Sequence, residues 1–190
     1  MLKPILKSYW EICLLRRSPA DTLYSWLLLG IFSFLYFILV EFQWHFQKLP
    51  SEYMIKNPVI SGLLMLLANY IYIGGLLKAL GKANRFVQTT TSLMAVHSIL
   101  HVFLLPLILI MSQLMVLPGA ANQAVETGSG TLIVMILIGI LSLVITIWQL
   151  VVIIYLLRKA MDTDQLSAVL AMFGLLAFTN LFASILGSLL

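Results

Sequence analysis

Charged side chains are scarce in this sequence of 190 residues. Asp, Glu, Lys and Arg together make up 9% of it, whereas hydrophobic residues make up 62%. A water-soluble domain needs roughly 25% charged residues to cover its surface. This composition therefore excludes a soluble fold, and we expect the chain to lie in a lipid bilayer, where lipid surrounds its apolar faces.

Cysteine and the common catalytic motifs are also lacking. Cys13 is the only cysteine, which excludes an internal disulfide and any cysteine-based metal cluster. The sequence has no Walker loop, no HExxH motif and no GxSxG motif, so familiar NTPases and hydrolases are not indicated. From these absences we predict a protein that is not an enzyme and that has no cofactor and no bound metal.

Five long apolar stretches make up most of the chain. They cover residues 22–40, 58–77, 90–116, 131–157 and 165–189. About 20 helical residues cross a hydrocarbon core of roughly 30 Å. The stretches are continuously apolar, whereas the strands of a membrane barrel alternate between polar and apolar residues. The sequence therefore predicts an all-α membrane protein, with a bundle of five transmembrane helices over residues 22–190.

Residues 1–21 have a different pattern. Apolar residues recur there at helical spacing, beside a charged stripe: Leu2, Ile5, Leu6, Tyr9 and Cys13, with Lys3, Lys7 and Glu11. This pattern predicts a short amphipathic helix in the membrane interface, apolar side down, with Tyr9 and Trp10 at the level of the lipid headgroups. The alternative is a cytosolic helix that packs on the protein's own loops.

The basic residues predict the orientation of the bundle. With the N-terminus in the cytoplasm, nine cations lie in cytoplasmic segments, and only Lys48 and Lys56 lie outside. The nine are Lys3, Lys7, Arg16, Arg17, Lys78, Lys82, Arg85, Arg158 and Lys159. This positive-inside bias places the C-terminus in the periplasm. Short basic clusters between apolar stretches are typical of membrane topology, so we expect no nucleic-acid partner.

Several segments carry a resemblance to a known family. They are "RRSPADTL" before the first span, "RFVQTTTSLMAVHSILHVFLLPLILI" with a proline midway, and "GILSLVITIWQLVVIIYLLRKAMDTDQLSAV", in which Trp148 precedes a Leu-Arg exit. In this order the chain resembles the Yip family of small polytopic membrane proteins, in its compact bacterial form. The resemblance implies a five-span, multi-pass protein of a bacterial inner (plasma) membrane, and it supplies no catalytic residue.

Eukaryotic members of that family bind Rab-type GTPases and act in vesicle traffic between endoplasmic reticulum and Golgi. They carry a longer cytosolic N-terminal arm with an acidic-aromatic motif, which this chain lacks. The resemblance therefore does not carry GTPase binding over to this protein. The expected partners are the lipid bilayer and either other membrane proteins or a second copy of the chain.

His97 and His101 are the most conspicuous polar residues within an apolar stretch. Residues at i and i+4 share a helix face, so both imidazoles can approach one ion or form part of a proton relay. A zinc site needs three or four ligands, and relays normally include a carboxylate. No Asp, Glu or Cys falls within the five predicted spans. We therefore favour a structural role, in which each histidine hydrogen-bonds to a neighbouring helix.

Other polar residues lie in the predicted spans. Asn69, Gln149 and Asn180 are costly in lipid, so we expect them to face the bundle interior. Together with His97 and His101 they form the candidate intramembrane polar site. Pro106 cannot donate a hydrogen bond to the carbonyl four residues back, so a kink is expected there.

Two hypotheses about function follow. The first is a non-enzymatic, Yip-like inner-membrane protein that binds or organises other membrane components. The alternative is a small transporter or channel that uses His97, His101 and the interior amides. Small residues such as Gly62 and Gly139 mark close helix contacts, which serve either internal packing or a partner's helix.

Overall fold

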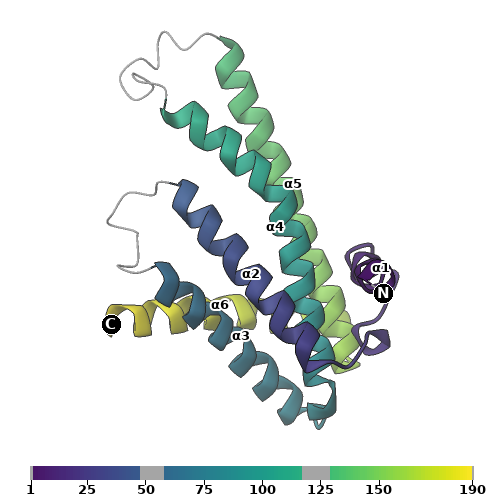
Figure 1. Ribbon diagram of the computed structural model, residues 1–190. Coiled ribbons are helices and arrows are strands. Elements are labelled where there is room, and N and C mark those ends of the chain that lie inside the picture. The colour runs from purple at the N-terminus through teal and green to yellow at the C-terminus, as the bar shows by residue number, and fades with distance from the viewer. Residues whose placement is uncertain (1, 48–57, 117–128, 190) are drawn as a thin grey trace.

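The computed structural model describes residues 2–47, 58–116 and 129–189, and these residues form helices and no strand. Figure 1 shows their arrangement. The helices are α1 (Leu2–Cys13), α2 (Trp26–Gln47), α3 (Pro58–Ala79), α4 (Phe86–Val116), α5 (Ser129–Met161) and α6 (Gln165–Leu189). Two short 3₁₀ turns, η1 (Pro19–Asp21) and η2 (Ala83–Arg85), precede α2 and α4.

Five of these helices, α2 to α6, are long and apolar enough to cross a membrane, which confirms the predicted all-α fold with five candidate spans. The helix that corresponds to the first predicted span, 22–40, has different bounds. The helix begins at Trp26 and continues through Glu41, Gln43 and His45 to Gln47. These polar residues alternate with large apolar ones. Glu41 lies beside Gly62 of α3 and Gln43 contacts α4, whereas His45 is exposed.

The helices are tied together most closely at one end. There α3 leads through η2 into α4, α5 turns into α6, and η1 contacts both α4 and α5. We call this the basic end, because Lys82, Arg85, Arg158 and Lys159 lie there. In Figure 1, α4 and α5 extend side by side beyond the far end of α2, while α6 lies across their direction against α3.

The helix α1 packs on the side of the bundle. Tyr9, Ile12 and Cys13 are almost completely buried, and the Tyr9 ring meets the Phe32 ring of α2 edge-on, with centroids 4.8 Å apart. Burial raises the pKa of Tyr9 and of Cys13 to about 12. The apolar face of α1 therefore covers the protein's own helices, whereas Trp10 is 43% exposed. The position of Tyr9 and Trp10 at headgroup level stays a prediction.

Polar contacts fix the segment that joins α1 to α2. The Gln88 side chain on α4 donates to the carbonyls of Ala20 (3.1 Å) and Thr22 (2.9 Å). Arg17 forms an ion pair with Glu11 at 3.3 Å and donates to the Asp21 carbonyl at 3.1 Å. The N-terminal segment is thus attached to the bundle by packing and by hydrogen bonds.

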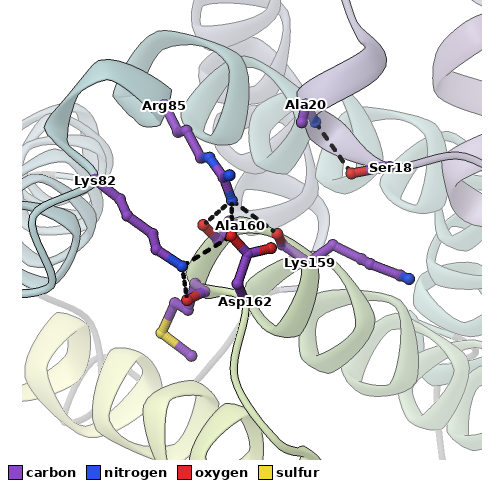
Figure 2. A network of polar contacts seen from close by, with 8 residues as sticks. Ser18, Ala20, Lys82, Arg85, Lys159, Ala160 and Asp162 are labelled. Carbon is purple, nitrogen blue, oxygen red and sulfur yellow. Dashed lines mark hydrogen bonds and ion pairs between the residues drawn. The ribbon is translucent and has the colours of Figure 1, made fainter.

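A network of charges joins the two turns of the basic end (Figure 2). Asp162, which follows α5 with a positive φ of 50°, forms ion pairs with Lys82 (2.9 Å) and Arg85 (2.7 Å). Both cations also reach the carbonyls that end α5: Lys82 donates to Met161, and Arg85 donates to Ala160 at 3.1 Å. These carbonyls have no partner within the helix, and cations are favourable at that end of the helix dipole.

Small residues allow two of the helix contacts. A Cβ added at Gly62 would lie 2.5 Å from Oε1 of Glu41 and 2.9 Å from the Phe37 ring, so α3 approaches α2 closely there. Gly174 on α6 is close to Tyr72, whose hydroxyl donates to the Ala171 carbonyl at 2.9 Å. Gly139 on α5 differs from both, because no atom lies within 4 Å of a Cβ added there.

Candidate functional site

His97 and His101 meet polar side chains from two other helices. They lie one turn apart on α4, with Tyr36 and Gln43 of α2 on one side and Gln149 of α5 on the other. Tyr36 and Gln43 are seven residues apart, which places them on one face of α2. We call these five residues the amide–histidine cluster.

Gln43 binds His101 through both ends of its amide. Nδ1 of His101 is 2.7 Å from Oε1 of Gln43, and Nε2 of Gln43 donates to the His101 carbonyl at 3.1 Å. An amide oxygen only accepts, so the proton of this imidazole lies on Nδ1. Gln43 is 5% exposed, so this bidentate contact is a dry link between α2 and α4.

His97 is bound from the opposite side. Nε2 of Gln149 lies 3.1 Å from Nδ1 of His97. An amide nitrogen only donates, so Nδ1 accepts and the ring proton lies on Nε2. That Nε2 is buried and has no hydrogen-bond partner. The two histidines are therefore opposite tautomers, each selected by the glutamine of a different helix.

Aromatic contacts complete the cluster. The two imidazoles stack at 6.2 Å between centroids, with 18° between their planes. The buried Tyr36 ring meets both of them edge-on, at 5.2 Å from His97 and 5.6 Å from His101. The contacts run from Gln43 through both histidines to Gln149, so the cluster joins α2, α4 and α5.

Two of the predicted site residues lie elsewhere. Asn69 is buried on α3, and its amide donates to the Met65 carbonyl of its own helix at 2.7 Å. Asn180 on α6 is exposed and donates to Leu176 in the same way, so the expectation that it faces the bundle interior is wrong. Pro106 lies within α4, which is helical from Phe86 to Val116. The kink at Pro106 stays a prediction.

Gln43 and Tyr36 were missed from the sequence. The cause is the early end predicted for the first span, which left Gln43 outside it. The spacing of seven residues between Tyr36 and Gln43, on a helix continued past Val40, is the signal that would have found them. The longer helix also brings Glu41 into a span, but this carboxylate lies next to Gly62 of α3 and forms no ion pair or hydrogen bond with either histidine.

The geometry gives the cluster little room for chemistry. In the described part of the chain, no group of three or more His, Cys, Asp or Glu residues could hold a metal ion. On His97, the Nδ1 lone pair that a zinc ion would need already accepts from Gln149. Neither His97 nor His101 lines the cavity at Trp148, the cavity at Glu41 or the cavity at Arg158. The cluster is arranged to hold three helices in register.

No protein-family model, curated protein or solved structure matches this chain.

Proposed function

We propose that this protein is a non-enzymatic, Yip-like polytopic protein of a bacterial inner membrane, which binds other membrane components through α5 and organises them. The observation that carries this proposal is the exposure of α5. None of its most apolar 18-residue stretch is buried, whereas 28–33% of the equivalent stretch is buried in each of the other four spans.

The length of α5 supports the proposal. Its 33 residues extend about 50 Å, compared with a hydrocarbon core of about 30 Å. Beyond the part that contacts α1 and α6, α5 lies beside α4 among the described helices (Figure 1). This part of α5 carries Gly139, whose surroundings are open. Small residues let two helices approach closely in a membrane, and in the described part of the chain no helix approaches Gly139 in this way.

The amide–histidine cluster also supports an organising role over the transport alternative. Both Nδ1 atoms are occupied by glutamine amides, and neither histidine lines a described cavity. A solute path would need polar groups that face an open passage. We therefore assign the cluster to holding α2, α4 and α5 together, so that α5 is presented at a fixed angle.

We further propose that the basic end faces the cytoplasm. The turn before α2, the turn between α3 and α4, and the turn between α5 and α6 contact one another there. Cytoplasmic loops carry an excess of Lys and Arg. This orientation places residues 1–21 in the cytoplasm or at its interface and the C-terminus in the periplasm.

Site-specific photo-crosslinking in native membranes tests the proposed role of α5. A photoreactive amino acid at Leu143, one turn from Gly139, should give a discrete protein adduct, either with another protein or with a second copy. The same group at Leu170 of α6 is the matched control, because Leu143 is 59% and Leu170 is 64% exposed.

A second variant makes this test specific. Gly139→Ile fills the open face and should remove the Leu143 adduct while the bundle stays folded, since no atom lies near that position. Equal adducts from Leu143 and Leu170, or a Leu143 adduct that persists in Gly139→Ile, would contradict the proposal.

A further inference from the structure

One face of α5 follows the end of α1 along the outside of the bundle. Val144, Trp148, Val151, Tyr155 and Arg158 recur every three or four residues, so they form a single stripe on the helix. The first two line one cavity and the last three line a second. Consecutive residues of the α1 end, Leu14 and Leu15, line the first and the second cavity respectively. The two cavities therefore follow one another along α5, and we refer to them together as the groove.

The first part of this groove is apolar. Its volume is about 410 Å³, and its walls include Trp10 of α1, Leu14 just after it, Leu100 and Phe103 of α4, and Trp148 of α5. The volume falls within the range of about 300–1,000 Å³ that is usual for small-molecule sites. No charged side chain lines it. Such a space suits a hydrocarbon chain.

The second part is smaller and ends in a cation. It measures about 200 Å³ and is lined by Tyr155, Arg158 and Gln165, together with apolar residues. In the described part of the chain Arg158 forms no ion pair, in contrast to Lys82 and Arg85. Arg158 acts electrostatically on Asp164, which accepts hydrogen bonds from Ser167 at the start of α6. Arg16, next to Leu15, is a second exposed cation.

From this juxtaposition we infer that the groove binds one anionic phospholipid, with an acyl chain in the apolar part and the phosphate against Arg158. A soluble anion would leave the apolar part unused. A zwitterionic lipid would bring its ammonium group into a region that already carries Arg16, Arg158 and Lys159. The apolar part of the groove favours a ligand with an acyl chain, and the cations favour one with an anionic headgroup. Both features therefore indicate an anionic lipid.

Lipid binding here does not depend on the proposed role of α5, because the groove lies beside α1 and the crosslinking surface is centred on Gly139. α1 forms one wall of the groove, so an occupied groove holds α1 against α4 and α5. The bound lipid acts as an additional packing element between them.

Native mass spectrometry of the full chain, delipidated in mild detergent, tests this inference. Phosphatidylglycerol and phosphatidylcholine with identical acyl chains are titrated separately, with glycerol 3-phosphate as a chain-free probe. Phosphatidylglycerol should bind first, one molecule per chain and about fivefold tighter than phosphatidylcholine, as expected for one basic contact. Glycerol 3-phosphate should not bind. Equal binding of the two lipids, or binding of glycerol 3-phosphate alone, overturns the inference without any variant.

Two variants locate the lipid. Arg158→Gln should weaken phosphatidylglycerol binding about fivefold, whereas Lys78→Gln, which removes an exposed cation on α3, should leave it unchanged. Val144→Trp fills the apolar part and should reduce binding of both lipids at this site. Ile136→Trp is its matched control, because it is similarly exposed and does not line the groove. Equal effects within either pair place the lipid elsewhere and overturn the assignment.

Discussion

The two ends of α5 are made of the same kinds of residue and have different surroundings. Near the basic end Val152, Ile153 and Leu156 are at most 1% exposed. Towards the opposite end Leu132 and Leu137 are 58% and 60% exposed. The contrast shows that hydropathy does not decide which part of a membrane helix packs. Which part packs depends on the neighbouring elements, and besides α4 these are α6, η1 and α1.

The two ends of α5 therefore differ in their contacts. At the basic end the helices are fixed by apolar packing, by the amide–histidine cluster above it and by the charges around Asp162. Towards the far end α5 has an exposed apolar surface, which the proposed function assigns to a partner from outside the chain. The following three predictions test this division.

The largest effect is expected from truncating the packed end of α5. Leu156→Ala leaves a cavity among fully buried neighbours and should lower the free energy of unfolding by about 2–5 kcal/mol. Leu137→Ala, at the exposed end, should change it by only a few tenths. Equilibrium unfolding in mixed detergent and SDS micelles measures both. Equal losses in the two variants would refute the division.

A moderate effect is expected from the link between His97 and Gln149. Hydrogen bonds between membrane helices are worth about 0.6 kcal/mol on average and up to about 1.7 kcal/mol. A double-mutant cycle of His97→Leu and Gln149→Leu should give a coupling energy in this range. Pairing His97→Leu with Asn180→Leu is the control and should give none, because Asn180 bonds only within its own helix. Absence of coupling in the first cycle would mean that the glutamine does not hold His97.

The smallest effect is a dependence of stability on pH. Hydrogen bonds from Lys82 and Arg85 lower the pKa of Asp162. A carboxyl group whose pKa is lowered by folding stabilises the folded state above its unfolded pKa of about 3.9, and this contribution is lost as the pH falls through the folded value. Asp162→Asn should therefore lower the thermal midpoint at neutral pH and have no effect at low pH.

A second background checks the source of this pH dependence. In a Lys82→Gln, Arg85→Gln chain, Asp162→Asn should change the midpoint little at either pH, because the carboxylate has lost its partners. A full neutral-pH effect of Asp162→Asn in that background would show that the two cations are not its cause.

The sequence predicts the number and type of the helices because apolar runs of this length have only one common solution in lipid. It does not predict what each face contacts. The apolar stripe of α1 fits a lipid surface and a protein surface equally well, and only the fold shows Tyr9, Ile12 and Cys13 against other helices. Isolated polar residues do not show where a helix ends either, because Gln43 lies within α2.

The candidate site was predictable in part. The sequence places His97, His101 and Gln149 in one intramembrane polar site, and Gln149 lies within hydrogen-bond distance of His97. The choice between Gln149, Asn69 and Asn180 could not be made, because it depends on the rotation of each helix about its axis. Asn69 and Asn180 instead bond one turn back along their own backbones, an option open to any helix.

The network at Asp162 also has a consequence for how the chain is built. Lys82 and Asp162 are 80 positions apart in the sequence. Lys82 and Arg85 are therefore synthesised well before Asp162, the partner of both. When the first three spans have been made, Lys82 and Arg85 still lack Asp162, so the two turns of the basic end are not yet joined by ion pairs. The turn between α5 and α6 supplies Asp162, so the ion pairs at this end form only after that turn has been made.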